Sequence, residues 1–260
     1  MISLIIILCI SIVLLIILIV RKVEKFYNET SNFNKFDTIM YINLEKRKDR
    51  KKQILCQLKK VGIKEEKITR IDAVYEKYNG HIGCAKSHLK ALQLAKQKNY
   101  KNIVVFEDDF VFTLDKNDVN NKIDRFLEDY GNNWDIVQLT TVFKNLEDIE
   151  KDYLKKVNYA STSSGYIINS RFFTKLIKNL SEAIDHMVKE MIEFHKENSN
   201  KKKYETGYAL DQYWGSLQKN SAWYIFYPYL GTQGGDAGAS SIMEKVEDFT
   251  NKIEMFNINV

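Results

Sequence analysis

The chain has 260 residues, of which 45% are hydrophobic, and it carries a net charge of +5 at pH 7. This length and apolar content fit one globular domain of about 200 residues or more with an appendage. The charge is modest and much of it lies in one block, residues 45–53, so nucleic-acid binding is not expected. Three cysteines without a CxxC pair exclude a disulfide framework.

The N-terminal residues 2–20 form an uncharged apolar run that is interrupted only by Ser3, Cys9 and Ser11. As a helix, this run would nearly cross the hydrocarbon core of a bilayer. We therefore expect residues 1–22 to be a transmembrane helix that anchors a single-pass membrane protein. A cleaved signal peptide is the alternative, but the run is long for such a signal, and neither a basic region before it nor a small-residue cleavage site after it is present.

The charges that follow the apolar run predict its orientation. Arg21, Lys22 and Lys25 come directly after it, so the positive-inside rule places the C-terminal body in the cytosol. Glycosylation sequons at Asn28 and Asn179 would matter only in a lumen, and a luminal body stays open as the alternative. The polar residues 23–36 are expected to form a tether between anchor and body.

From residue 37 onward, strand-like and helix-like stretches alternate, which predicts an α/β domain over residues 37–260. In chain order the expected elements are a strand at 38–43, a helix at 49–61, a strand at 68–74, a helix at 83–95, strands at 102–107, 135–140 and 164–169, helices at 170–180, 181–196 and 210–217, and a strand at 223–227. The glycine-rich segment 231–241 is expected to be a loop. This alternation is typical of a largely parallel sheet.

Three consecutive carboxylates, Glu107, Asp108 and Asp109, stand at the end of the apolar strand 102–107. Like charges so close together repel one another unless a cation, a ligand or water relieves them. A solvated loop is one explanation. A metal site is the other, because hard divalent cations prefer carboxylate oxygens, and the strand ends of α/β sheets are where ligands bind.

Residue types that suit phosphate binding precede the acids. Arg47 and Arg50 follow the first strand, where a guanidinium can grip a diphosphate, although a solvated helix face explains them as well. Ser87 and His88 lie one turn into the helix that begins near Gly83, and helix N-termini attract anions. A His88 that packs in the core is the ordinary alternative.

Two further groups have chemistry that the sequence leaves open. His81, Cys84 and His88 are spaced so that they could bind zinc, but no paired motif or fourth ligand supports this site. In the glycine-rich segment, Asp236 or Gln233 could complete a metal shell if the segment closes over a ligand. A surface turn is the alternative for that segment.

In their order and spacing, these motifs resemble glycosyltransferase family 25, which contains lipopolysaccharide-biosynthesis and procollagen galactosyltransferases. The segments that carry the resemblance are INLEKRKDR (42–50), GHIGCAKSH (80–88), FEDD (106–109), SSGYIINSRFFTKL (163–176), ALDQYW (209–214) and GGDAGASSI (234–242). The chain departs from the family where SSI replaces a frequent Ser-Asp, and no histidine follows His195. The third protein ligand of a metal is therefore not identified.

The resemblance implies a GT-A-like, Rossmann-type fold with a mixed, mostly parallel sheet flanked by helices. It implies transfer of a hexose, galactose or glucose, from a UDP-sugar to a hydroxyl acceptor with inversion. The acceptor, whether glycan, lipid-linked or protein, is not specified, and neither is the oligomeric state. The implied cofactor is a divalent metal such as manganese.

By the same resemblance, residues of the motifs take roles. Asp109, Glu107 and Asp236 would bind the metal, and Asp211 would be the general base, with Asp236 in reserve. Asp211 also opens a predicted helix, where an acid can simply complement the helix dipole. The residues expected to line the donor side are Asn43, Arg47, Arg50, Ser87, His88 and Glu107.

Two functions of other classes stay open. A catalytically degenerate relative, anchored at a membrane as a binding or scaffold module, would bind a donor without transferring its sugar. A divalent-metal phosphohydrolase would share the acidic strand end, but the sequence has no obvious nucleophile motif for it.

Overall fold

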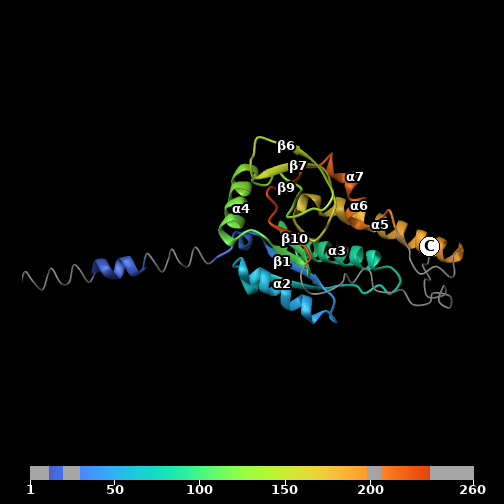
Figure 1. Ribbon diagram of the computed structural model, residues 1–260, viewed down its shortest axis with the longest axis horizontal. Coiled ribbons are helices and arrows are strands. Elements are labelled where there is room, and N and C mark those ends of the chain that lie inside the picture. Colours follow the sequence, from blue (N-terminus) through green and yellow to red (C-terminus); the bar gives the residue numbers. More distant parts are fainter. Residues whose placement is uncertain (1–11, 20–29, 198–205, 235–260) are drawn as a thin grey trace, which may run out of the picture.

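The computed structural model describes residues 12–19, 30–197 and 206–234. The strands are β1 (Thr38–Asn43), β2 (Ile68–Asp72), β3 (Asn102–Glu107), β4 (Phe110–Phe112), β5 (Ile136–Gln138), β6 (Lys144–Asp148), β7 (Leu154–Ala160), β8 (Gly165–Asn169), β9 (Trp223–Phe226) and β10 (Gly231–Gln233). The helices are η1 (Asn32–Lys35), α2 (Lys48–Lys60), η2 (Glu65–Lys67), α3 (Gly80–Gln97), α4 (Lys116–Tyr130), α5 (Ser170–Glu197), α6 (Leu210–Tyr213) and α7 (Gly215–Gln218). Figure 1 shows their arrangement.

Eight strands form one mixed sheet in the order β2-β1-β3-β8-β5-β9-β7-β6, and β10 pairs with β4 separately. Strand β1 runs parallel to β2 and β3, and β5 runs parallel to β9. The remaining pairings are antiparallel, and together they reverse only β7 and β8 relative to β1. Most strands therefore run in the same direction, which confirms the predicted mixed, mostly parallel sheet.

Both faces of the sheet are covered, because side chains alternate between them along each strand. In β3, Ile103 and Val105 belong to one core cluster, and Val104 and Phe106 belong to the other. A strand buried on both faces needs a continuous apolar run, which is what made β3 recognisable in the sequence.

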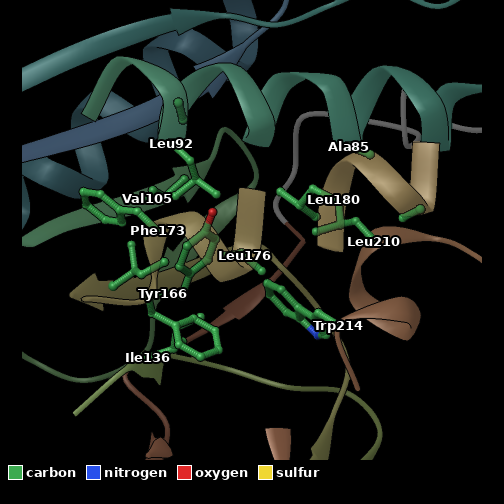
Figure 2. Close-up of a cluster of buried hydrophobic side chains, with 14 of the residues drawn as sticks. Ala85, Leu92, Val105, Ile136, Tyr166, Phe173, Leu176, Leu180, Leu210 and Trp214 are labelled. Carbon is green, nitrogen blue, oxygen red and sulfur yellow. The ribbon is translucent and has the colours of Figure 1, made fainter. Parts of the chain in front are cut away.

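The first core cluster lies between the sheet and helices α3 and α5, which also contact one another. Figure 2 shows Leu92 of α3 and Leu176 of α5 near Tyr166, which comes from β8. Because α3 packs on this face, its first turns are held at the edge of the sheet where β1 and β3 end.

The second core cluster lies under η1, α2 and α4 on the opposite face. Phe33 and Phe36 are fully buried in it, and the backbone N–H of Ser31 donates to the carbonyl of Gly62. These residues fall within the stretch 23–36 that we expected to be a tether. Their aromatic side chains instead belong to the core, so the body already includes residues 30–36.

Several helical boundaries differ from the expectation. The two helices expected at 170–180 and 181–196 are one, α5, because Ser181 continues the helix and its hydroxyl donates to the carbonyl of Ile177. The helix expected at 210–217 is divided at Trp214 into α6 and α7. The first three residues of the expected loop 231–241 form β10. Helix α4 and strands β6 and β7 were not predicted.

Residues 12–19 are helical and exposed. Among the described residues, none of the helices combines the length and the apolar character that crossing a bilayer requires. Residues 1–11 and 20–22 of the expected anchor lie outside the described part of the chain.

Candidate active site

The carboxyl ends of β1 and β3 meet at one edge of the sheet, where they border a cleft with the segment after β2 and the start of α3. The cleft holds about 660 Å³ of space, counting its open mouth. Residues predicted from the sequence gather along its wall: Asn43, Arg50, Ser87, His88, Glu107 and Asp109. Ligands of α/β folds bind at this edge of the sheet.

Asp108, the middle acid of the triplet, is fully engaged by neighbouring side chains. Asn43 donates to one of its oxygens at 2.7 Å, and Arg50 donates to the other at 3.2 Å. Burial nevertheless raises the pKa of Asp108, although Asn43 and Arg50 oppose that effect. Both of its oxygens already have partners, so Asp108 holds the cleft wall together.

Asp109 is less well compensated. Arg50 donates to its Oδ2 at 3.3 Å, but its Oδ1 is buried and has no hydrogen-bond partner among the described residues. Burial and the negative charge of Glu107 raise its pKa to about 7. Its backbone carbonyl accepts from the N–H of Gly234, which ties the acidic turn to the end of β10. Asp109 thus presents an unpaired oxygen at the wall of the cleft.

Glu107 belongs to a buried hydrogen-bonded chain. His88 Nε2 lies 3.2 Å from its carboxylate, Ser163 donates to the same oxygen, and His88 Nδ1 lies 3.0 Å from the hydroxyl of Tyr166. Burial raises the Glu107 pKa, but the contacts with His88 and Ser163 outweigh it, and the net pKa is below its ordinary value. Because a carboxylate only accepts, His88 donates to Glu107 from Nε2.

Ser87 acts on the cleft through the backbone. Its hydroxyl donates to the carbonyl of Gly83 and accepts from the N–H of Val74 at 2.8 Å. Val74 lines the cleft after β2. Ser87 therefore fixes a wall of the cleft against α3, and its hydroxyl is already used in doing so.

Part of the sequence that forms this site matches a known protein family. Residues 78–192 match the model of glycosyltransferase family 25 (LPS biosynthesis protein). These residues are similar to that family, and they make up 115 of the 260 residues of the chain. The match covers the start of α3, the acidic triplet and β8, so it confirms the resemblance that the motifs predicted. A search of curated proteins found no match.

Solved structures with a related arrangement are distant. A197 from STIV has 13% identity and a TM-score of 0.43, over 77% of this chain and 86% of that one. A glycosyltransferase involved in the glycosylation of the major capsid of PBCV-1 has 10% identity and a TM-score of 0.34, over 73% and 93%. A UDP-glucose pyrophosphorylase complexed with UDP-glucose has 10% identity and a TM-score of 0.43, over 80% and 78%. At these scores the likenesses support no assignment of function.

The donor set at the acidic triplet fits a hard divalent cation. Asp109 offers a buried, unpartnered carboxylate oxygen, and its pKa is raised by burial and by the neighbouring charge of Glu107. Asp108 is occupied, so the ends of the triplet, Asp109 and Glu107, are the residues that would hold the metal. A different group, Cys84, His88 and Glu107, places its ligand atoms within 4.8 Å of one another.

Two residues expected in the site are placed otherwise, and a third lies outside the part of the chain that the structure describes. Arg47 does not line the cleft and forms an ion pair with Asp49 at 2.7 Å. Asp211, in the first turn of α6, accepts from the backbone N–H of Thr162 at 2.9 Å and does not line the described cleft. Asp236 lies outside the described residues.

Other residues of the site were not assigned roles from the sequence. Ser163 and Tyr166 stand in the SSGYIIN segment, and only the position of β8 beside β3 reveals that they contact the Glu107–His88 pair. Tyr75 lines the mouth of the cleft and remains 54% exposed, with the ammonium group of Lys46 4.2 Å from its ring centre. Its position shortly after a predicted strand is the feature of the sequence that could have indicated a place in the cleft.

Proposed function

We propose that the protein is an inverting, metal-dependent glycosyltransferase that moves a hexose, galactose or glucose, from a UDP-sugar to a hydroxyl acceptor. The observation that carries the proposal is the Asp109 carboxylate, which lies in a cleft at the strand ends with one buried, unpartnered oxygen. The family 25 match over the same segment supports a sugar-transfer reaction.

Asp109 and Glu107 would hold the divalent cation, with manganese as the proposed ion and Asp236 as a proposed further ligand. When bound, such a cation stabilises the negative charge that grows on the diphosphate leaving group. Arg50 supplies a fixed positive charge within the acidic triplet, since it contacts Asp108 and Asp109 together.

The remaining residues would position the reactants. Asn43 donates to Asp108 and to the carbonyl of Arg47, so it fixes the end of β1 at the donor side. His88 orients Glu107, and Ser87 orients the wall at Val74. An inverting displacement needs a base for the proton of the acceptor hydroxyl, and we propose Asp211 for it, with Asp236 in reserve.

The test uses the full-length chain with a panel of UDP-sugars and manganese. We expect one donor to be hydrolysed slowly, with activity that a chelator removes and manganese restores. A scaffold module would bind a donor and never turn it over, and a phosphohydrolase would release inorganic phosphate from simple esters. Failure of all UDP-sugars to bind or react would contradict the proposed function.

We also propose that the body works at a membrane through residues 1–22, on the cytosolic side. The support is the apolar run and the basic residues after it. Asn179 lies 5% exposed within α5, so the folded body has no room for a glycan on that sequon. Protease protection in sealed vesicles is the suitable measurement, and a protected body would contradict the cytosolic orientation.

A further inference from the structure

A second type of ligand set shares one residue with the acidic triplet. Cys84 and His88 lie one turn apart on α3, and Glu107 faces them from the end of β3. The thiol sulfur, an imidazole nitrogen and a carboxylate oxygen all lie within 4.8 Å of one another. All three residues line the cleft, and the His88 side chain is fully buried behind its wall. Soft and borderline ligands of this kind select zinc over magnesium or manganese.

The separations are close to those that zinc requires. In a tetrahedral site with bonds of about 2.0–2.3 Å, neighbouring ligand atoms lie roughly 3.3–3.7 Å apart. His88 Nε2 and the Glu107 oxygen are already 3.2 Å apart. The widest separation in the group is no more than 4.8 Å, so contraction by about an ångström closes the set around one ion.

Residues around the triad hold two of its ligands in place. The Tyr166 hydroxyl fixes the His88 ring through Nδ1, and the Ser163 hydroxyl fixes the Glu107 carboxylate. Such outer contacts orient the ligands of protein zinc sites. A hydroxyl can both donate and accept, so Tyr166 can retain its contact when the His88 proton moves from Nε2 to Nδ1.

The geometry points to a zinc-type site formed by Cys84 Sγ, His88 Nε2 and Glu107, which shares Glu107 with the hard-cation position at Asp109. Binding moves the Nε2 proton of His88 to Nδ1 and releases the thiol proton of Cys84 to solvent. Three protein ligands leave a fourth position open to the cleft, as in exchangeable zinc sites. His81, which sequence spacing placed beside Cys84 and His88, is replaced in this set by Glu107.

The position predicts a consequence that rests on the proposed function. Glu107 would belong to both cation positions, and its single negative charge would be divided between the two ions. Zinc at the triad therefore competes with the manganese-loaded state and inhibits donor turnover. Zinc would then bind at the triad and act as an inhibitor, and manganese would bind at Asp109 and act as the cofactor.

Cobalt(II) titration of the metal-free, full-length protein tests the site without any activity measurement. A thiolate ligand gives cobalt an intense charge-transfer absorption, and zinc abolishes it by displacement. We expect this absorption in the wild-type protein and in Cys56→Ser, whose thiol is exposed on α2. Cys84→Ser should lose it, and His88→Gln and Glu107→Gln should weaken cobalt binding by about 10-fold or more.

Controls separate this inference from the proposed function. Cys84→Ser and Cys84→Ala are both used, and circular dichroism confirms that each is folded. Manganese binding, followed by electron paramagnetic resonance, should persist in Cys84→Ser and fall in Asp109→Asn. Absence of the absorption in wild type, or its persistence in a folded Cys84 variant, would overturn the zinc site even if donor turnover were observed.

Discussion

The guanidinium of Arg50 contacts the Asp109 carboxylate at 3.3 Å, although 59 positions separate the two residues in the chain. Arg50 lies in the first turn of α2, and the parallel pairing of β1 with β3 brings both residues to one edge of the sheet. The pKa of Asp109 is nevertheless raised to about 7 by burial and by Glu107. One arginine therefore does not neutralise the cluster, and a divalent cation would complete the compensation.

Asp109→Asn tests the metal assignment. An amide retains the shape of the side chain but is a poor ligand for a hard cation, so we expect manganese-dependent donor turnover to fall by roughly 100-fold or more. The thermal unfolding of the metal-free variant should match that of the wild type or exceed it, because a buried charge is removed. Turnover close to wild type would remove Asp109 from the metal site.

The same variant should change the pH dependence of stability. The folded-state pKa of Asp109, about 7, lies above its ordinary value of 3.8, so folding takes up a proton between those two pH values. Its contribution therefore makes the wild type less stable as pH rises from about 4 to 7, by on the order of 4 kcal/mol. Urea denaturation in chelator should show this decline reduced in Asp109→Asn, and identical pH profiles would contradict the raised pKa.

Arg50 and Arg47 form a matched pair for a stability test. Arg50→Ala leaves two buried carboxylates without their cation, so we expect a loss of about 3 kcal/mol in the free energy of unfolding at pH 8. The loss should shrink at pH 5, where Asp109 is protonated. Arg47→Ala should cost less than about 1 kcal/mol, since its partner Asp49 is 52% exposed. Equal losses in the two variants would contradict the central role of Arg50.

Some of this arrangement was predictable from local pattern alone. Strands β1 and β3 are continuous apolar runs because both their faces are buried, and each ends in polar residues at the cleft. Helix α4 was predictable from the sequence, because Val119, Ile123 and Phe126 share one helical face after the capping residue Asp115. Strand β6 had no such signal, since its residues are half-buried or exposed at the edge of the sheet.

The contacts of the site were less predictable than its residue types. Carboxylates, arginines and a histidine near strand ends indicate ligand chemistry, but which atoms meet depends on the order of the strands. Tyr166 contacts His88 across 78 positions only because β8 inserts beside β3 in the reverse direction. No periodicity in the sequence encodes that insertion. The ion pair of Arg47 with Asp49 depends on the geometry of the two side chains, so it could not be predicted from the sequence pattern either.

Asp211→Asn separates two roles of this residue. Asparagine keeps an oxygen that can accept from the N–H of Thr162, which has a left-handed backbone with φ of 79°, but it cannot take a proton. If Asp211 is the base, we expect transfer to an acceptor to fall by about 100-fold or more while calorimetric donor binding is unchanged. Transfer that survives in Asp211→Asn and is lost in Asp211→Ala would assign it to positioning Thr162 instead.

Gly231→Ala tests whether the β4–β10 pair supports the acidic turn. A Cβ at Gly231 would meet the carbonyl oxygen of Val111, and the Phe110 ring at 2.5 Å, so the pair must shift. We expect a loss of about 1–3 kcal/mol in the free energy of unfolding and weaker manganese binding, because β10 leads to the Gly234–Asp109 hydrogen bond. Urea denaturation and manganese titration measure the two effects.

The control for this substitution is Gly207→Ala, where a Cβ would have no neighbour within 4 Å. Its stability should stay within about 0.5 kcal/mol of wild type, and its manganese affinity should be unchanged. If Gly231→Ala loses stability but binds manganese as tightly as this control, the strand pair is needed for folding and not for the geometry of Asp109. Because the added methyl group lies against residues next to the triplet, we expect both properties to fall together.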